Sequence, residues 1–564
     1  MVPMGAVSYV PDETPLDIVL YTGPWWKQRH LAILNLMLFV PLITSYANGF
    51  DGSMMNGLQS VQEWKEYFGK LINLPHARHA ELGLFNAIQS IGSLSAIPFA
   101  PFVSDKFGRR TGIFSGASIT LAGAILQTLT RNLPTFVGAR FLIGFGTTFA
   151  MMASPLLISE LAYPTHRAPL TSLFNCLWFS GSIVAAWSTF GTFRIPNEWS
   201  WRIPSALQGL SSLVQFAFVW FIPDSPRWLV SVGRDEEARD ILKKWHAGGE
   251  ENNGLVHFEY HEIKRAIAQE AERNRSSWLD LFRTPGNRRR MRIIIAVGCF
   301  SQMSGNGLIS YYLERVLDGI GIKSSRDQTL INACLAIWNF VFAVGASLAV
   351  DKCGRRKLFL TSNAGMLVGF AVLTTCAGIY QNTGKTRAAH GVLAMVFAYQ
   401  AAYAIAYVPL LVSYTVEILP FFLRAKGLAL LFLTVEVSLI FSQYTNPIAL
   451  EKLKYKYYLI YTIWLVFELA FVYFFAVETR NRSLEETAAL FDGDEALPDV
   501  EDRPRPESLV VDHVSSQSSK TSLPLSCPPS AAGMLDKPRV FDGREGFQLY
   551  DLRGKPGSQS HASR

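Results

Sequence analysis

The hexapeptide Asp105-Lys106-Phe107-Gly108-Arg109-Arg110 returns in the second half of the chain as Asp351-Lys352-Cys353-Gly354-Arg355-Arg356. A second charged pattern is repeated in the same order, because Glu160 and Arg167 recur at the same spacing as Glu417 and Arg424. Two copies of the same charged residues at matching places predict an internal duplication. Each half of the chain then carries one copy of each pattern.

The segments around these loops are apolar. Of the 564 residues, 49% are hydrophobic and 17% are charged, whereas an average soluble chain has roughly 25% charged residues. About 20 apolar helical residues cross a hydrocarbon layer ~30 Å thick. Apolar runs near that length cover residues 31–50, 82–103, 111–130, 133–159, 168–193, 203–223, 293–313, 329–350, 358–382, 388–416, 427–450 and 457–477. We therefore predict an all-α membrane protein with twelve transmembrane helices in two six-helix halves. These runs exclude a soluble globular enzyme and a disordered or fibrous chain.

A polar stretch at 224–292 separates the sixth expected helix from the seventh, and its charges are spaced as in surface helices. We expect it to be a cytoplasmic helical insert between an N-terminal half at 31–223 and a C-terminal half at 293–486. Residues 1–30 are expected to form a cytoplasmic N-terminal tail without a signal peptide. Residues 487–564 have no sustained apolar period, so we predict a disordered cytoplasmic C-terminal tail.

The basic residues indicate the orientation of the helices. They cluster in the loops after the second and eighth expected helices and in the insert, which all lie on one side if the helices alternate. Short loops rich in Lys and Arg face the cytoplasm, so that side and both termini are predicted to be cytoplasmic. The same rule explains the net charge of +7 without nucleic acid as a partner.

Enzyme motifs and cofactor motifs are not found at plausible places in the sequence. The six cysteines have neither the spacing of a disulfide framework nor that of a zinc site. A Walker loop and a Ser/His/Asp set are also missing. We therefore expect no enzyme activity, no cofactor and no metal. Duplicated transmembrane halves around a central pathway are instead typical of transporters.

Several separate motifs resemble the sugar porter family of the major facilitator superfamily. They are Asn48-Gly49-Phe50-Asp51, the two hexapeptides, Pro223-Asp224-Ser225-Pro226-Arg227-Trp228-Leu229 and Glu478-Thr479-Arg480-Asn481-Arg482-Ser483-Leu484-Glu485-Glu486. Within this family, Ser304-Gly305-Asn306-Gly307 followed by Ser310-Tyr311-Tyr312 resembles the fungal lactose permease and cellodextrin transporter branch. The resemblance implies a proton-coupled sugar symporter of the plasma membrane that imports a disaccharide of the lactose or cellobiose type, or a hexose. An uncoupled facilitative carrier and a non-transporting sugar sensor remain alternatives.

Asp51 is the first candidate for coupling. It follows 20 uncharged residues, and a charge near the bilayer centre costs about 2.5–3.5 kcal/mol even on the lenient insertion scale. Arg140 is the only charged residue in the fourth expected helix, so the two side chains are candidates to meet. The resemblance implies that Asp51 is the proton site and Arg140 its partner. The alternative is that Asp51 marks a helix end at the extracellular water boundary.

The seventh expected helix offers the polar and aromatic groups that sugars require. The resemblance implies sugar contacts at Gln302 and Asn306, and it extends them to Asn175 and Asn339. One family glutamine is replaced here by Ser301, and the family tryptophan of helix 10 is replaced by Val412. These departures favour a ligand larger than glucose. The full candidate set is Asn175, Gln302, Asn306, Tyr311, Tyr312, Asn339 and Glu436, and the alternative for each is helix–helix hydrogen bonding.

The last two expected helices each contain one acid inside an apolar run. Glu436 is expected to be a second protonatable group, a sugar ligand or a structural acid, and the sequence does not choose among these. Glu468 is expected to be peripheral.

The repeated charged patterns are expected to form a cytoplasmic gate in which acids pair with arginines, although basic loops that only orient the chain are the alternative. The candidate gate residues are Asp105, Gly108, Arg109, Arg110, Glu160, Arg167, Asp351, Gly354, Arg355, Arg356, Glu417, Arg424 and Glu478. The expected partners of the protein are the sugar, protons and the lipid bilayer. Ser and Lys residues in the C-terminal tail suit phosphorylation or ubiquitin attachment.

Overall fold

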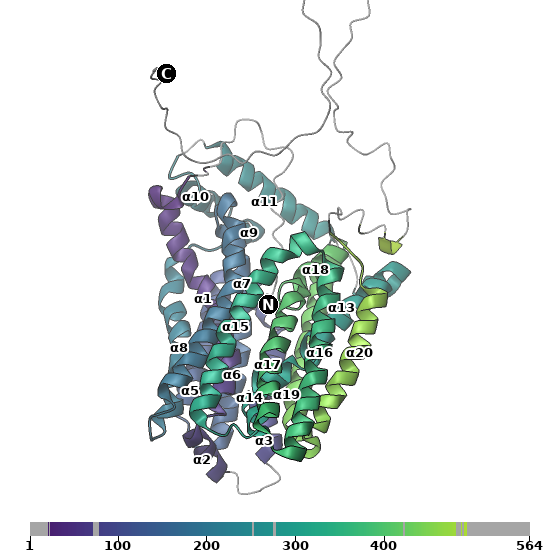
Figure 1. The fold of residues 1–564 in the computed structure, drawn as a ribbon. Coiled ribbons are helices and arrows are strands. Elements are labelled where there is room, and N and C mark those ends of the chain that lie inside the picture. Colours follow the sequence, from purple (N-terminus) through teal and green to yellow (C-terminus); the bar gives the residue numbers. More distant parts are fainter. Residues whose placement is uncertain are drawn as a thin grey trace, which may run out of the picture. The chain divides into compact units, whose positions relative to one another are not determined.

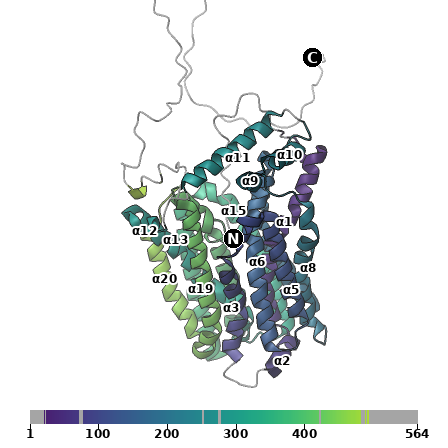
Figure 2. The same cartoon turned by 180° about the vertical axis from the view of Figure 1, so that it is seen from behind.

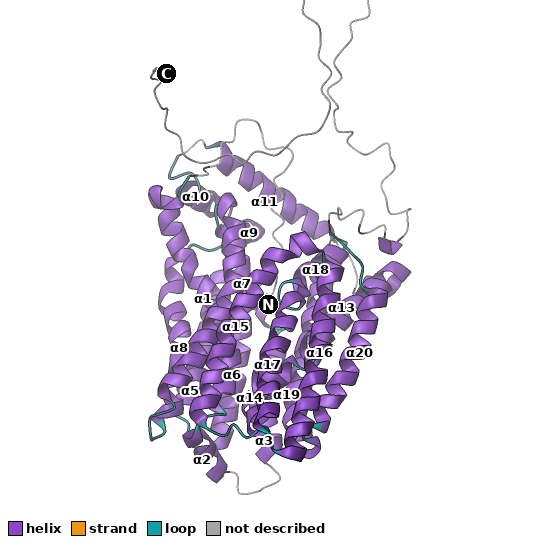
Figure 3. Cartoon of the chain, viewed as in Figure 1, coloured by secondary structure: helices purple, strands orange, loops and turns teal. Residues whose placement is uncertain are grey.

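The computed structural model of the chain describes residues 21, 23–71, 78–250, 253–273, 278–420, 423–480, 487 and 490–492. Nearly all of the two predicted tails therefore lies outside the described residues. The described part is built from helices joined by short loops and contains no strand (Figure 3).

The N-terminal half contains eight α-helices. Its elements are η1 (Trp25–Lys27), α1 (Arg29–Leu58), α2 (Gln62–Leu71), α3 (Arg78–Ala96), α4 (Ala100–Phe107), α5 (Arg109–Thr128), α6 (Leu133–Leu161), α7 (Pro164–Thr192), α8 (Trp199–Phe218) and η2 (Val219–Phe221). Four short or amphipathic helices follow in the predicted insert. These are α9 (Pro226–Ser231), α10 (Asp235–Trp245), α11 (Gly254–Arg273) and α12 (Asp280–Arg283).

The C-terminal half repeats the pattern of long helices. Its elements are α13 (Pro285–Met303), α14 (Asn306–Asp318), α15 (Ser325–Cys353), α16 (Arg355–Thr383), α17 (Thr386–Ala406), α18 (Leu410–Ile418), α19 (Arg424–Leu453) and α20 (Lys456–Phe475). In Figures 1 and 2 the purple and blue helices of the first half lie on one side of the bundle and the green helices of the second half on the other. The insert helices α9–α11 lie at one end of the bundle, which we call the insert end, and α2 lies at the opposite, far end.

Three of the twelve expected helices are broken rather than continuous. The second is divided into α3 and α4, bent by 43° at the turn that contains Pro98, because proline cannot donate the helical hydrogen bond and clashes with the preceding turn. The tenth is divided into α17 and α18 beside Pro409. The seventh is divided at Gly305, whose φ of 103° is one that glycine adopts readily.

Among the described residues, nine helical segments are long and apolar enough to cross a membrane, and the bent pair α3–α4 is a tenth. The helices that complete the twelve, α5 and α8, are less apolar because they carry Gly, Ser and Thr where they pack closely. A methyl group built at Gly116 of α5 would lie 2.6 Å from the backbone nitrogen of Ala150 in α6. Small residues of this kind let membrane helices approach each other.

The two halves have separate apolar cores. The core of the C-terminal half is one cluster that includes Phe370 and Tyr399, whereas clusters around Leu157 and Phe136 fill the N-terminal half. The halves meet where α7 packs on α15 and α3 packs on α19. Large apolar side chains such as Leu36 and Phe474 are exposed on outer helices, which is unfavourable in water and suits a hydrocarbon environment.

Candidate functional site

The two candidates for proton coupling lie inside the N-terminal half. Asp51 is 1% exposed about two turns before the end of α1, and Arg140 is 2% exposed in α6. Because α1 continues to Leu58 and the Asp51 side chain is buried, Asp51 is not the last residue of its helix. Thr147 of α6 donates a hydrogen bond to Asp51 Oδ2 at 3.3 Å.

Asp51 and Arg140 interact electrostatically without a direct hydrogen bond between them. Asp51 Oδ1 and Arg140 Nε and Nη1 make no close hydrogen bond among the described residues, and the amide of Gln208 in α8 is a further polar group that faces Asp51. Buried polar groups are normally hydrogen-bonded. A buried cluster with several unsatisfied groups is therefore a candidate for binding or exchange of a proton.

Tyr311 extends this cluster toward the C-terminal half. It lies on α14, and it interacts electrostatically with Arg140 of α6 and with Glu436 of α19. One carboxylate oxygen of Glu436 is buried without a hydrogen-bond partner among the described residues. Tyr311 thus interacts with the arginine beside Asp51 in one half and with Glu436 in the other.

Three polar side chains of the C-terminal half are joined by hydrogen bonds. Ser310 Oγ donates to Asn306 Oδ1 at 2.9 Å, and Gln400 Nε2 of α17 donates to Ser310 at 3.4 Å. Gln400 was not among the sequence candidates, although it is a buried amide in an apolar helix, which is a signal that sequence can give. Gln302 lies about one turn before Asn306, in the last turn of α13, and its Nε2 donates to Ser301 Oγ at 3.4 Å.

The other candidate sugar-binding residues differ in burial and in the groups around them. Asn339 of α15 has a buried side-chain oxygen without a partner among the described residues. Asn175 is exposed on α7. Tyr312 is fully buried in an apolar cluster with Phe50 and Met54 of α1, and its hydroxyl donates to the backbone oxygen of Gln443. The structure therefore joins Tyr312 to the contact between the halves rather than to the polar residues.

A hydrogen-bonded closure at the far end was not predicted. Backbone angles of Tyr312 (φ −136°, ψ 30°) kink α14 and free backbone groups on either side. The Leu313 N–H donates to Asn56 Oδ1 at 3.1 Å, and the Tyr311 carbonyl accepts from Gln59 Nε2 at 2.9 Å. Asn56 belongs to α1 and Gln59 directly follows it, so the end of a helix in one half satisfies the broken backbone of the other.

Two further contacts strengthen this closure. Lys65 of α2 forms a 2.6 Å ion pair with Glu314 of α14, and Ser90 of α3 donates to Gln443 of α19 at 3.1 Å. Asn56 and Glu314 follow the predicted sites Asp51 and Tyr312 by a few residues in the same helices, whereas Gln59 and Lys65 lie beyond the end of α1. Their partners could not be read from the sequence, because they lie in the opposite half.

The repeated hexapeptides form matching structures at the insert end. Arg109 binds Glu160 at 3.1 Å and Asp105 at 3.0 Å, and Arg355 binds Glu417 at 2.9 Å. Each of these ion pairs lies within one half. They therefore join neighbouring helices of the same half, and the expected pairing of acids with arginines occurs inside each half.

A glycine and an acid complete each of these loops. Gly108 and Gly354 have φ of 97° and 90°, values that glycine adopts without strain. Glu478 accepts the backbone N–H groups of Arg355 at 2.8 Å and Arg356 at 3.2 Å. Asp224 has the equivalent role in the first half, accepting from the Arg110 N–H at 3.5 Å. The acids that follow the sixth and twelfth spans thus cap the start of α5 and α16.

The remaining gate candidates differ between the halves. Arg167 donates to the carbonyl of Ala162 and also binds Glu259 of the insert at 3.2 Å. Arg424 makes the equivalent backbone bond, to the Leu419 carbonyl at 3.4 Å, and Arg356 donates to the Tyr473 carbonyl. The side chain of Asp351 lies outside the described part of the chain.

The insert has its own polar contacts. Asp235 accepts a hydrogen bond from the Tyr260 hydroxyl at 2.6 Å and pairs with Lys264 at 3.2 Å. The bond from Tyr260, followed by that from Lys264, lowers the pKa of Asp235. Hydrogen bonds to Tyr260 and Asp235 raise the pKa of Lys264. These contacts link α10 to α11 on the surface.

Glu468 corrects an expectation from the sequence. It was expected to be peripheral, but its side chain is 0% exposed in α20, and neither carboxylate oxygen makes a close hydrogen bond among the described residues. Glu468 interacts electrostatically with Cys299 of α13 and with Tyr399 and Tyr403 of α17, which places it inside the C-terminal half.

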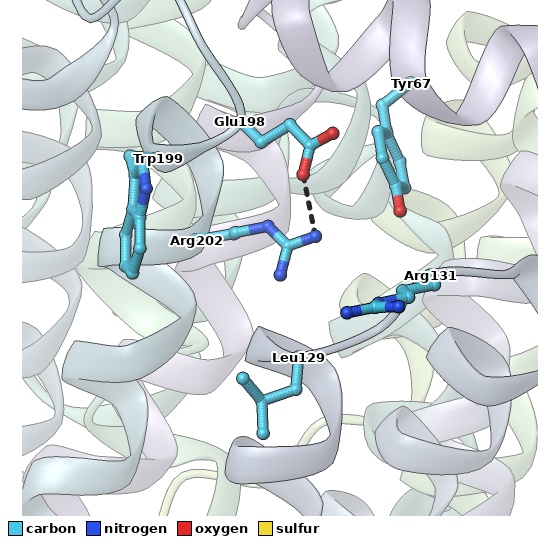
Figure 4. Close-up of a pocket in the computed structure, with 6 residues that line it drawn as sticks. All are labelled: Tyr67, Leu129, Arg131, Glu198, Trp199 and Arg202. Carbon is cyan, nitrogen blue, oxygen red and sulfur yellow. Dashed lines mark hydrogen bonds and ion pairs between the residues drawn. The ribbon is translucent and has the colours of Figure 1, made fainter.

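A surface pocket of about 580 Å³ lies at the far end of the N-terminal half (Figure 4). Its lining includes an ion pair in which Arg202 donates to Glu198 at 2.8 Å. The lining residues are Tyr67, Leu129, Arg131, Glu198, Trp199 and Arg202. Because they all belong to one half, this pocket is not the candidate transport site. Within the described ranges, no group of three His, Cys, Asp or Glu side chains could hold a metal ion.

The fold and the duplicated loops define a class of membrane transporter. Solved structures of the xylose transporter XylE from E. coli have the same fold. In its inward-open conformation XylE is 24% identical, with a TM-score of 0.68 and coverage of 81% of this chain and 100% of that one. A second XylE structure, described as a major facilitator superfamily proton:xylose symporter bound to 6-bromo-6-deoxy-D-glucose, is 25% identical, with a TM-score of 0.63 and coverage of 82% and 99%.

The family model "Sugar (and other) transporter" matches residues 37–491. The chain therefore belongs to this family of transporters, as predicted, and is a multi-pass membrane protein with the twelve-helix major facilitator fold. The MFS-type transporter oryC of Aspergillus oryzae is 28% identical over 82% of this chain and 87% of its own length. The high-affinity glucose transporter of Kluyveromyces lactis is 26% identical over 83% and 87%.

Proposed function

We propose that the protein is a proton-coupled sugar symporter of the plasma membrane that works by alternating access. The observation that carries this proposal is the buried cluster of Asp51 and Arg140, each of which lies about two turns inside the end of a long apolar helix. An acid that a neighbouring arginine can neutralise, or that can take up a proton instead, is suited to coupling. The related XylE, described as a proton:xylose symporter, supports the same class of activity.

In the proposed orientation the insert end is cytoplasmic, so both termini lie in the cytosol. The hydrogen bonds of Asn56 and Gln59 then close the extracellular side in this conformation. Protonation of Asp51 would weaken its attraction to Arg140, sugar would bind between the halves, and the halves would rock. The C-terminal tail would carry regulatory modifications instead of taking part in this cycle.

For the substrate we propose a disaccharide of the lactose or cellobiose type in preference to a hexose. Asn306, Ser310 and Gln400 supply hydrogen-bonding groups in the C-terminal half. Val412 stands where the family carries a stacking tryptophan, which leaves more space for a second ring. Glu436, whose carboxylate can accept bonds from two hydroxyl groups, is our candidate for a sugar ligand that differs from the hexose pattern.

The test is accumulation of radiolabelled sugar in proteoliposomes with an imposed potential and pH gradient. One proton driven by 100 mV supplies ~2.3 kcal/mol, and at ~1.4 kcal/mol per tenfold this is roughly 40-fold accumulation. We expect Asp51→Asn to abolish accumulation and to keep sugar exchange, because the amide has the same shape but does not take up the proton. Asp327→Asn, on an exposed acid of α15, is the matched control and should behave as wild type.

Each alternative gives a different result in this assay. An uncoupled carrier would equilibrate sugar in the wild type without accumulating it, and a sensor would bind sugar without uptake. If Asp51→Asn still accumulates sugar in a pH-dependent way, the assignment of Asp51 is wrong and Glu436 becomes the candidate. Competition by a panel of mono- and disaccharides identifies the substrate.

A further inference from the structure

A buried histidine fastens the insert to the N-terminal half. His246 directly follows the last residue of α10 and caps that helix. Its side chain is 1% exposed, and each ring nitrogen faces a different partner. Nδ1 lies 2.6 Å from Glu259 Oε2 of α11, and Nε2 lies 3.1 Å from the carbonyl oxygen of Leu161, the last residue of α6. His246 therefore connects the insert helices α10 and α11 to the end of the transmembrane helix α6.

Both partners of this imidazole are hydrogen-bond acceptors. A neutral imidazole has one N–H and can donate to only one of them, while its other nitrogen would face an acceptor with a lone pair. Protonation of Glu259 instead would relieve that conflict, but Arg167 binds the other oxygen of Glu259 at 3.2 Å and favours the ionised carboxylate. The contacts are satisfied together only by a doubly protonated His246.

Other charged and titratable groups face this contact from each neighbouring element. α11 contributes Glu259, which is 3% exposed at its side chain, and α7 contributes Arg167 and His166. α1 contributes His30, which interacts electrostatically with His246, and the ring of Tyr163 lies 5.6 Å from the His246 ring. His246 and Arg167 thus contact one buried carboxylate, and repulsion from His246 disfavours a charged imidazole at His30 or His166.

We infer that His246, Glu259 and Arg167 form a proton-operated latch that holds the insert on the N-terminal half at low pH and releases it as pH rises. Histidine is the side chain whose charge changes in the physiological range. The docked insert needs the protonated form, so the stability that the latch contributes is complete at low pH and is lost as the proton leaves. A symporter whose insert end faces the cytosol would thereby sense the proton concentration that its own activity raises.

The latch is tested by hydrogen exchange of the full-length protein in lipid nanodiscs, without sugar or gradient, between pH 5.5 and 8.5. Protection factors, corrected for intrinsic exchange, are measured for residues 254–268. We expect protection in the wild type to fall by up to about tenfold per pH unit through the transition, the limit for one proton. His246→Gln and Glu259→Gln should give low protection with no pH dependence.

His261→Gln is the matched control, because His261 is exposed on the same helix, and it should keep the wild-type pH dependence. Wild-type protection that is flat across the range would overturn the proposal, and so would an unchanged slope in His246→Gln. Nitrogen chemical shifts of ¹⁵N-histidine-labelled wild-type protein provide a measurement that needs no variant. One histidine should keep both ring protons at pH values where the exposed histidines have lost one, and its absence would overturn the proposal.

Discussion

Asn56 Nδ2 of α1 donates a hydrogen bond to Asn332 Oδ1 of α15 at 2.8 Å, and both side chains are buried. Asn56 Oδ1 meanwhile accepts the Leu313 N–H that the kink in α14 leaves free. One amide therefore joins a helix of the N-terminal half to two helices of the C-terminal half. Since Asn56 lies on the same helix as Asp51, a movement of α1 on protonation would act directly on this closure.

We predict that Asn56→Ala opens the far end. The substitution leaves the Leu313 N–H and the Asn332 amide without their partner, which costs about 1–3 kcal/mol. Spin labels at the exposed positions 66 and 326 report the separation of the halves at that end. The population of long distances in substrate-free nanodiscs should increase severalfold.

Asn197→Ala is the control for that experiment, because the Asn197 side chain accepts only from the N–H of Trp199 in its own loop. Its distance distribution should equal that of the wild type. If Asn56→Ala and Asn332→Ala both leave the distribution unchanged, the amide pair does not hold the far end closed.

Gly354→Ala is predicted to destabilise the C-terminal half. The backbone there has φ of 90°, and an added methyl group would lie 2.8 Å from Glu478 Oε2, which caps α16. Strain of this kind costs about 1–3 kcal/mol. The melting temperature in detergent should fall, whereas Gly345→Ala, at a position with no atom within 4 Å of the new methyl group, should leave it nearly unchanged. Equal melting temperatures for both variants would show that the loop adapts to a side chain.

Asn306→Ala and Gln302→Ala are each predicted to weaken sugar binding by about 1–3 kcal/mol, because sugar hydroxyls would lose their partners. Direct binding of the radiolabelled substrate by purified protein measures the change. Thr375→Ala is the control, since its exposed hydroxyl bonds only to the carbonyl of Ala371 in its own helix. Wild-type affinity in both amide variants would place the sugar site away from α13 and α14.

The sequence was sufficient for the features that repeat along the chain. The paired hexapeptides and the length of the apolar runs predicted the two halves, because charge and hydrophobicity act locally and leave a pattern in every span. The breaks were harder to predict. Pro41 and Pro155 lie inside continuous helices, whereas Pro98 lies at a 43° bend, so the residue type alone does not decide whether a helix breaks.

Contacts between distant parts of the chain were outside the reach of sequence reasoning. Asp51 and Arg140 could be proposed because a charge in an apolar helix is conspicuous by itself. Asn56 is equally polar, but its role in the closure depends on contacts with Asn332 and with the kink at Tyr312. Only the packed structure brings these residues together. Glu259 and His246 belong to a charged segment, and no sequence pattern distinguishes this buried pair from the exposed charged residues around it.

The burial of Glu468 leads to a last prediction, which is that Glu468→Leu stabilises the protein. Neither carboxylate oxygen makes a close hydrogen bond among the described residues, and the indole of Trp464 is the polar group that faces the acid. A poorly satisfied buried group of this kind costs about 1–3 kcal/mol in a protein interior. Leucine removes this cost at similar volume, so the melting temperature should rise by several degrees. Leu465→Ala, at a fully buried position of the same helix, should lower it, since a cavity there costs about 2–5 kcal/mol. A fall in stability for Glu468→Leu, with transport lost, would show instead that the acid bonds a partner in another state of the transport cycle.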